Sequence, residues 1–321
     1  MSTDLIFLFL GLFVLILGGD FLVKGSSNIA LRLKLSPLVV GLTIVAFGTS
    51  SPELLVSVKA ALSGSPDLTM GNVIGSNICN LALVLGVTAI IRPIHVQGDS
   101  IKIDWPMTMG SSVLLYFLVR EGLLKSFEGL LFIFLLISYT GFVIIKSRKE
   151  NRRLELGKRT QLNDSNWKHL LKDIVFIVLG CFGLFYGSDW FVEGAKGIAL
   201  YFGVSERVIG ITVLALGTSL PELVTASVAS FKDQTDLAIG NLMGSNIFNI
   251  LSILGITSII KEIQVSDVIL NIDIIWMLGI TLLILPMMVH KRIVGRYEGM
   301  VLLLIYAYYT YKVLSNSPNV F

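Results

Sequence analysis

Two short repeated motifs carry the residues of this sequence that are best suited to bind a cation. They read GTSSPE at 48–53 and GTSLPE at 217–222. Pro52 and Pro221 lack a backbone N–H and disrupt the preceding helical turn, which frees the carbonyl group four residues earlier. Each turn therefore offers a carboxylate, two hydroxyls and an unpaired carbonyl, the hard oxygen ligands that Ca²⁺ and Na⁺ prefer. Neither motif contains histidine or cysteine, which argues against zinc and copper.

The two glutamates of these motifs, Glu53 and Glu222, each lie inside a long apolar run. A charged side chain at the centre of a membrane helix costs about 2.5–3.5 kcal/mol, so such residues usually have a function. A single Pro-kinked helix that satisfies its own backbone with Ser and Thr needs no ion. Two matched copies, each with a buried glutamate, favour an ion site over that alternative.

A second repeated block reads GNVIGSNICN in the first copy and GNLMGSNIFN in the second. The pairs Ser76 with Asn80 and Ser245 with Asn249 are each spaced by four residues, which places each pair on one face of a helix. The asparagine amide has a carbonyl oxygen and two N–H donors, so it could coordinate a cation or hold a glutamate. The block therefore adds candidate oxygen ligands to the two turns.

Other duplicated residues have simpler structural interpretations. Glycines spaced by four residues allow close helix packing, and an acidic residue before an apolar run can cap a helix. Two aspartates that follow the dipeptides GG and GS, Asp20 and Asp189, could mark a helix break or a proton route, but a structural hydrogen-bonding role is favoured. These residues are Gly71, Gly75, Gly240 and Gly244 for packing, Asn77 and Asn246 for hydrogen bonding, Asp67 and Asp236 for capping, and Asp20 and Asp189 for the last group.

All these motifs belong to one internal duplication with a constant offset of 169 residues. Between 35–90 and 204–259 the two copies share 25 identities in 56 aligned positions. Duplicated halves with interrupted apolar segments are typical of transporters with a central ion site.

Composition indicates an all-α membrane protein, since 54% of the residues are hydrophobic and only 15% are charged. Ten apolar runs predict ten transmembrane helices, and the first is long enough that we expect it to be tilted or broken near Gly18. The N-terminus lacks the basic region of a signal peptide, so we interpret it as the first membrane helix. The runs lie at 5–31, 37–62, 68–91, 105–119, 129–145, 174–200, 206–231, 237–260, 273–289 and 299–315.

The charge pattern predicts the topology. Residues 146–173 hold nine Lys and Arg against four acidic residues, and such loops remain cytoplasmic. We interpret this segment as a solvated tether between halves, not as a nucleic-acid-binding region. Both termini are then extracytoplasmic, and because each half has five helices the repeats are inverted. The expected units are a first repeat at 1–145 with its motif at 41–80, the loop, and a second repeat at 174–321 with its motif at 210–249.

The duplicated GTSxPEL and GNxxGSNxxN blocks resemble those of the prokaryotic sodium/calcium exchangers of the calcium/cation antiporter superfamily. The resemblance covers the whole membrane region and implies four central ion sites built by helices 2, 3, 7 and 8. Some relatives carry aspartate at the position of Asn249, including K⁺-dependent exchangers, so the two asparagines here favour a K⁺-independent protein. The implied ligands are Ala46, Thr49, Ser50, Glu53, Ser76, Asn80, Ala215, Thr218, Ser219, Glu222, Ser245 and Asn249, with the two alanines acting through their carbonyls.

The sequence thus favours a secondary antiporter of the cell membrane that exchanges Na⁺ for Ca²⁺ and extrudes Ca²⁺. The ions are its substrates, so we expect no cofactor and no enzymatic activity. No Walker motif occurs, which argues against ATP as the energy source. The alternatives are a Ca²⁺/H⁺ antiporter, a K⁺-dependent exchanger, a passive cation channel and, from the pair Asp20 and Asp189, an intramembrane aspartyl protease.

Overall fold

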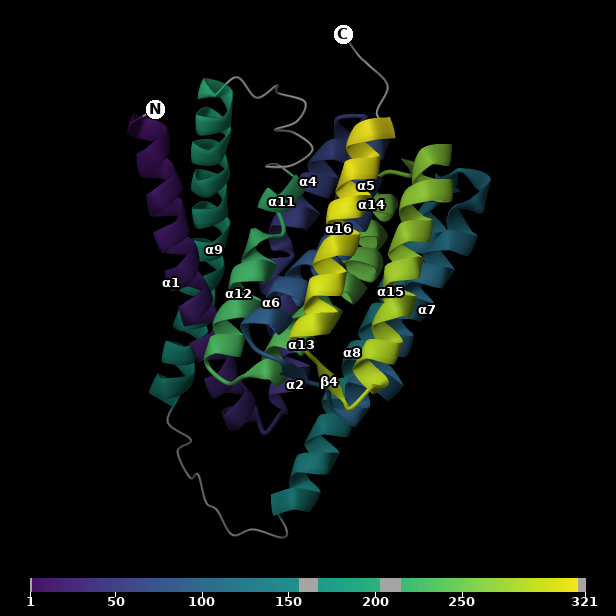
Figure 1. Ribbon diagram of the computed structural model, residues 1–321. Helices are drawn as coiled ribbons and strands as arrows, with labels where there is room; N and C mark the ends of the chain where they lie inside the picture. Colours follow the sequence, from purple (N-terminus) through teal and green to yellow (C-terminus); the bar gives the residue numbers. More distant parts are fainter. Residues whose placement is uncertain (1, 156–166, 203–214, 317–321) are drawn as a thin grey trace.

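The computed structural model describes residues 2–155, 167–202 and 215–316, and most of them are helical (Figure 1). The first half contains α1 (Ser2–Leu33), α2 (Pro37–Val40), η1 (Gly41–Val45), α3 (Ala46–Thr49), α4 (Ser51–Leu62), α5 (Pro66–Ile78), η2 (Cys79–Val84), α6 (Leu85–Ile91), β1 (Ile94–His95), η3 (Ser100–Asp104), α7 (Trp105–Leu118), η4 (Val119–Glu121), β2 (Leu123–Leu124) and α8 (Ser126–Glu155). The second half contains α9 (Trp167–Tyr201), α11 (Ala215–Gly217), α12 (Leu220–Phe231), α13 (Thr235–Phe248), η6 (Asn249–Leu254), α14 (Gly255–Ile260), β3 (Ile263–Gln264), η7 (Ile269–Asp273), α15 (Ile274–Val289), β4 (Ile293–Val294) and α16 (Arg296–Asn316).

The two longest helices, α1 and α9, lie side by side along one flank of the molecule (Figure 1). Glycines spaced by seven residues on each helix face the other helix. A Cβ atom added at Gly18 would lie 2.7 Å from the backbone nitrogen of Leu184, and one at Gly180 would lie 2.6 Å from that of Leu22. Backbones approach this closely only where side chains are absent. Of the two alternatives expected for this long run, a tilt or a break near Gly18, the break is wrong, because the glycine serves helix packing and α1 is continuous.

Two short antiparallel sheets connect the halves. Strand β1 of the first half pairs with β4 of the second, and β2 pairs with β3. The segment η3–α7 runs from β1 to β2, whereas η7–α15 runs from β3 to β4. The two sheets therefore lie at opposite ends of these helices.

Glycines also join the halves within the helical region. A Cβ atom at Gly299 would lie 2.7 Å from the carbonyl oxygen of Gly86, and one at Gly129 would lie 2.6 Å from that of Gly255. Helix α16 thus packs on α6, and α8 packs on α14, in the same manner. Each half contributes one partner to each contact.

Both proline motifs interrupt a helix as predicted. Helices α3 and α4 meet at Ser50, where the axis bends by 46°. Ser50 has φ −88° and ψ 6°, and Ser219 before α12 has φ −90° and ψ 2°. The equal backbone angles show that the two motifs fold in the same way. Pro52 and Pro221 follow within the first turn of the next helix.

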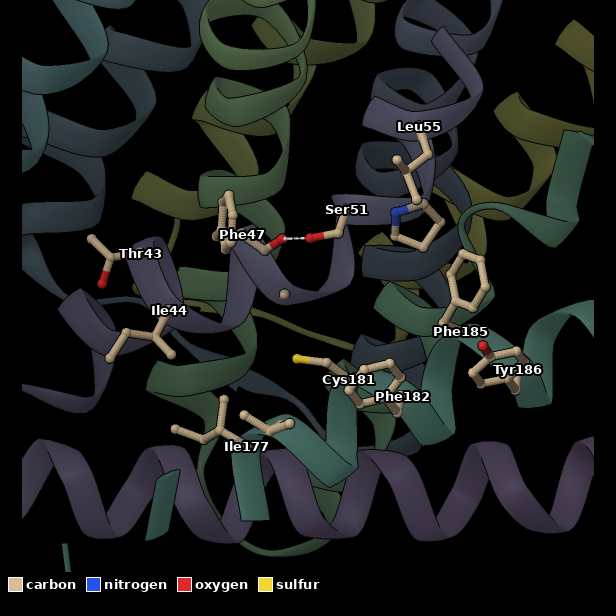
Figure 2. A pocket seen from close by; sticks show the side chains of 13 residues that line it. Thr43, Ile44, Phe47, Ser51, Leu55, Ile177, Cys181, Phe182, Phe185 and Tyr186 are labelled. Atoms are coloured by element: carbon tan, nitrogen blue, oxygen red, sulfur yellow. Dashed lines mark hydrogen bonds between the residues drawn. The ribbon is translucent and has the colours of Figure 1, made fainter. Parts of the chain in front are cut away.

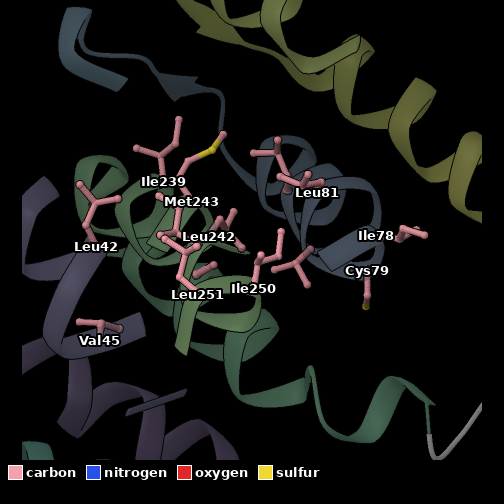
Figure 3. Close-up of a cluster of buried hydrophobic side chains, with 14 of the residues drawn as sticks. Leu42, Val45, Ile78, Cys79, Leu81, Ile239, Leu242, Met243, Ile250 and Leu251 are labelled. Carbon is pink, nitrogen blue, oxygen red and sulfur yellow. The ribbon is translucent and has the colours of Figure 1, made fainter. Parts of the chain in front are cut away.

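A buried hydrophobic cluster holds the motif-bearing helices together (Figure 3). Leu42 of η1 packs against Leu242 and Met243 of α13, and all three are at most 2% exposed. The packing role predicted for the second pair of glycines is confirmed, because a Cβ at Gly244 would lie 2.7 Å from the Cα of Leu42. At Gly71 and Gly75, in contrast, an added Cβ would have no described atom within 4 Å.

Six described helical segments are long and apolar enough to cross a membrane, or seven if the bent pair Pro37–Thr49 and Ser51–Leu62 forms one span. The expected runs 105–119 and 299–315 are occupied by α7 and α16, which are not among these six. The start of the expected run 206–231 and the middle of the basic segment lie outside the described residues. Helices α8 and α9 extend into both ends of that segment, so it is not a loop throughout.

The close contact between α1 and α9 makes a prediction about stability. Gly18→Ala forces a methyl group against the α9 backbone, and overpacking of this kind costs about 1–3 kcal/mol. Gly141→Ala is the matched control, because its new methyl group meets no described atom within 4 Å. We expect a lower apparent Tm for Gly18→Ala in detergent and an equal or higher one for Gly141→Ala. Equal Tm values for Gly18→Ala and the unmodified protein would contradict this packing.

Candidate functional site

The two proline turns meet in the interior of the molecule. Glu53 and Glu222 are both 0% exposed. The Ser50 hydroxyl of the first turn donates a hydrogen bond to Oε1 of Glu222 in the second turn at 2.9 Å. Ser245 donates to the same oxygen at 3.3 Å. The structure therefore brings residues of both repeats onto one carboxylate.

Thr49 extends this junction between the halves. Its hydroxyl lies 3.1 Å from Oδ1 of Asn241 and 3.4 Å from the hydroxyl of Ser245. It also lies 3.4 Å from the carbonyl oxygen of Ala46. That carbonyl accepts the backbone N–H of Ser50 at 3.0 Å, so it already has helical partners.

Several buried oxygens at this junction have no hydrogen-bond partner among the described residues. Burying a polar atom without a partner usually costs about 1–3 kcal/mol, so a cluster of such atoms points to a bound species that satisfies them. Oxygens without donors match a cation. The atoms are both carboxylate oxygens of Glu53, Oε2 of Glu222, Oγ of Ser219, and the side-chain carbonyl oxygens of Asn80 and Asn249.

The asparagines of the second block are positioned by hydrogen bonds between the halves. Asn249 donates its amide to Oδ1 of Asn77 at 3.0 Å, which leaves its own Oδ1 without a partner. Asn77 donates in turn to the carbonyl oxygen of Asn246 at 3.4 Å. Asn246 donates to the carbonyl oxygen of Leu242 at 2.7 Å. The structural role predicted for Asn77 and Asn246 is confirmed.

For three other predicted ligands, the structure gives the position in the fold and, for two of them, the burial of the side chain. Ser76 is 3% exposed on α5, and Thr218 is half-buried between α11 and α12. Ala215 is the first described residue of α11, and its side chain lies outside the described part of the chain.

Two residues that position the site were missed in the sequence. The amide of Asn72 donates to the carbonyl oxygen of Glu53 at 3.2 Å and to the Ser57 hydroxyl at 2.9 Å. Ser188 of α9 donates to the carbonyl oxygen of Gly217 at 2.5 Å, and this is the carbonyl that Pro221 frees. The repeated Gly-Asn pair was a visible signal for Asn72. Ser188 had no such signal, because its equivalent in the first half is a glycine.

The structure defines the surroundings of Asp20, Asp67 and Asp236, three duplicated or capping candidates of the sequence. Asp20 forms an ion pair with Lys232 at 2.5 Å, which ties α1 to the end of α12 and agrees with the structural interpretation. The capping role predicted for Asp67 and Asp236 is wrong. Ser65 and Gln234 occupy the N-cap positions, and each aspartate lies within the first turn instead.

A separate cavity of about 680 Å³ lies between the bent pair of helices, Pro37–Thr49 and Ser51–Leu62, and α9 (Figure 2). Its wall differs from the central junction of the two proline turns. Aliphatic and aromatic side chains form most of its wall. The hydroxyls of Thr43 and Ser51 are bonded to the carbonyl oxygens of Val39 and Phe47, each at 2.7 Å. The wall is thus mostly apolar, and these two hydroxyls already have partners.

Comparison with known proteins agrees with this geometry. A family model described as "Sodium/calcium exchanger protein" matches residues 3–145 and 172–314. The chain belongs to the sodium/calcium exchanger family. It is therefore an integral, multi-pass membrane transporter, and the two matched segments correspond to its two repeats.

Members of the family and related proteins align over nearly the whole chain. The chain is 37% identical over 319 residues to "Putative antiporter CaxA" of Alkalimonas amylolytica, covering 98% of this chain and 100% of that protein. It is 32% identical over 338 residues to "Sodium/calcium exchanger MaX1" of Methanosarcina acetivorans, covering 95% and 97%. A structure of the sodium-calcium exchanger NCX_Mj soaked with 10 mM Na⁺ and zero Ca²⁺ matches with a TM-score of 0.83 at 30% identity, covering 98% of this chain and 99% of that chain.

The hydrogen bond from α9 to the freed carbonyl makes a prediction about stability. Ser188→Ala leaves the buried carbonyl of Gly217 without this donor, at a cost of about 1 kcal/mol. Ser51→Ala is the control, because its exposed hydroxyl bonds the carbonyl oxygen of Phe47, four residues earlier in the same half. We expect a lower apparent Tm for Ser188→Ala than for Ser51→Ala. Equal values would show that this bond does not hold α9 to the second turn.

Proposed function

We propose that this protein is a secondary antiporter that exchanges Na⁺ for Ca²⁺ at one central site. The observation that carries the proposal is the meeting of two buried glutamates, one from each repeat, among oxygens without partners. Both are fully buried, and Glu222 accepts hydrogen bonds from Ser50 and Ser245, which belong to different repeats. Membership of the exchanger family supports the choice of ions.

The charge of the site explains obligatory exchange. Two carboxylates carry a charge of about −2, which one Ca²⁺ neutralises and which several Na⁺ ions can also balance. Two unpaired anions buried together cost several kcal/mol, so an unloaded site disfavours the rearrangement that would carry it across the membrane. Transport in one direction then requires a bound ion, and return requires another.

The ligands of the transported ions are proposed to be the twelve residues identified in the sequence. Glu53 and Glu222 would bind Ca²⁺ directly, with Asn80 and Asn249 supplying side-chain carbonyl oxygens of the hard type that Ca²⁺ and Na⁺ accept. The hydrogen bond that Asn249 donates to Asn77 supports this role, because it fixes the Asn249 amide and leaves the Asn249 carbonyl oxygen without a partner among the described residues. Two asparagines at these positions leave the site with two carboxylates and favour K⁺-independent exchange.

Ten helices in two inverted five-helix repeats are the proposed arrangement, with units at 1–145, 146–173 and 174–321. The crossed pairing of β1 with β4 and β2 with β3 supports it, since equivalent strands lie at opposite ends of the molecule. The basic segment between the halves supports a cytoplasmic connection and extracytoplasmic termini. We further infer that Na⁺ entry down its gradient drives Ca²⁺ extrusion.

The pair α1 and α9 is proposed to move against the rest of the molecule. These helices pack on each other through glycines, and Ser188 reaches the carbonyl freed by the second proline turn. A shift of α9 would therefore change the environment of the turn that carries Glu222. This provides a physical connection between helix movement and access to the site.

The proposal is tested by ⁴⁵Ca²⁺ uptake into proteoliposomes loaded with Na⁺, K⁺ or a buffer of low pH. We expect uptake only from Na⁺-loaded vesicles, and a loss of at least about 100-fold in Glu53→Gln and Glu222→Gln, because each variant removes half of the charge that balances Ca²⁺. Glu121→Gln is the matched control, since that carboxylate is exposed and pairs only with Lys125 at the surface. We expect it to transport normally.

Each other outcome of this experiment has a definite meaning. Uptake driven by the pH gradient alone would identify a Ca²⁺/H⁺ antiporter, and a requirement for K⁺ would identify a K⁺-dependent exchanger. Substantial Na⁺-driven uptake by either central variant would show that the two glutamates do not form the site.

A further inference from the structure

Two aspartates outside the central site occupy equivalent positions in the two halves. Asp104 and Asp273 are 169 residues apart, and each is the last residue of a π-helical turn, η3 or η7. Each accepts a hydrogen bond from a tyrosine of the last helix of its own half. Tyr139 donates to Asp104 at 2.8 Å, and Tyr309 donates to Asp273 at 3.1 Å. Neither aspartate is among the proposed ligands of the central site.

The two aspartates lie at opposite ends of the molecule. Asp104 begins the segment that leads away from β1, whereas Asp273 begins the segment that leads away from β3. The sheet β1–β4 and the sheet β2–β3 mark opposite ends of α7 and α15. Lys146, near the end of α8, pairs with Asp99 at 2.5 Å and so lies at the Asp104 end. In the proposed orientation this end faces the cytoplasm.

A cavity of about 240 Å³ joins Asp273 to the central region. Its wall includes Ser76, a proposed ligand, and Asn72, whose amide holds the carbonyl oxygen of Glu53. Tyr309 and Thr310 add hydroxyl groups to the same wall. The cavity thus extends from a carboxylate near one end of the molecule to α5, which carries the proposed ligand Ser76.

The equivalent region at the other end is packed. Asp104 is 2% exposed, and its Oδ2 is buried without a partner among the described residues. Asn241 and Ser245, the equivalents of Asn72 and Ser76, are both 0% exposed. Thr108, one turn after Asp104, contacts the sulfur of Met243 on α13 at 3.8 Å. The two ends therefore differ although their sequences correspond.

We propose that Asp273 lines an access route for Na⁺ and Ca²⁺ to the central site, and that Asp104 lines the matching route at the opposite end, which is closed in this conformation. The inference depends on the proposed antiport. One carboxylate with a few hydroxyls offers too few ligands to retain Ca²⁺, which takes six to eight oxygens. A carboxylate in a narrow cavity instead raises the local cation concentration and the rate of binding.

The test measures Ca²⁺ uptake as a function of Ca²⁺ concentration in membrane vesicles of both orientations. In right-side-out vesicles we expect Asp273→Asn to raise the KM for Ca²⁺ about tenfold, since a focusing charge accelerates association by at least this factor. In inside-out vesicles we expect the same effect from Asp104→Asn. Maximal rates stay unchanged, and the difference shrinks at high ionic strength because the attraction is screened.

Asp267→Asn is the matched control, because it removes the same charge from an exposed position near the Asp273 end. We expect no change in KM. Asparagine retains an acceptor for the tyrosine in both test variants. A second measurement uses Thr310→Cys with a cationic, membrane-impermeant thiol reagent, and the protein without this substitution gives the background. Inhibition from the Asp273 side alone supports the route.

The remaining outcomes are also decisive. Equal KM changes from both sides would make the aspartates part of the shared site, and unchanged KM values would remove them from the path; either overturns the proposal. Side-specific effects with the sides exchanged would support the routes and reverse the assigned orientation. Failure of the antiport itself is distinguishable, because the unmodified protein would then show no Na⁺-dependent uptake in either orientation.

Discussion

The structure depends on a pair of like charges buried together at the junction of two repeats. Glu53 and Glu222 have no water-exposed surface, and three of their four carboxylate oxygens have no described hydrogen-bond partner. Two carboxylates buried in this way are costly unless a bound cation or a proton compensates their charge. The turns that free oxygens, the serines that cross between repeats and the fixed asparagines all serve to place oxygen atoms around that charge. A bound cation would therefore both occupy the transport site and stabilise the buried carboxylates.

Glycine distribution determines which parts of the molecule are fixed to each other. Cross-repeat contacts such as Gly86 with Gly299 join the helices around the site, while Gly18 and Gly180 join α1 to α9. The second pair of motif glycines packs tightly against η1, but the first pair faces open space among the described residues. The same glycines of the two repeated blocks thus have different packing in the two halves. A cavity of about 240 Å³ lies beside Gly71 and Gly75, whereas Gly240 and Gly244 are in close contact with α2 and η1.

Local features were predictable from the sequence. The proline turns, their similar backbone and the burial of both glutamates follow from residue types within six positions. The capping assignment failed because Pro66 occupies the first helical position, so Ser65 becomes the cap and Asp67 lies inside the first turn. The prediction of a broken α1 failed because a glycine that could bend a helix can equally allow another backbone to approach it.

Contacts between distant residues were not predictable. The bonds from Ser188 to Gly217 and from Asn249 to Asn77 join segments that only the tertiary fold brings together. Periodicity identifies buried faces but does not show which faces meet. The crossed strand pairs and the Asp–Tyr pairs were missed for the same reason, although both are duplicated in the sequence.

Direct binding of Ca²⁺ to the purified protein tests the central claim most simply. Isothermal titration calorimetry in detergent should show one Ca²⁺ bound per chain between the two glutamates, with an affinity that falls as Na⁺ is added. The double variant Glu53→Gln with Glu222→Gln should show no binding. Binding of Ca²⁺ that is insensitive to Na⁺, or that persists in the double variant, would contradict the account.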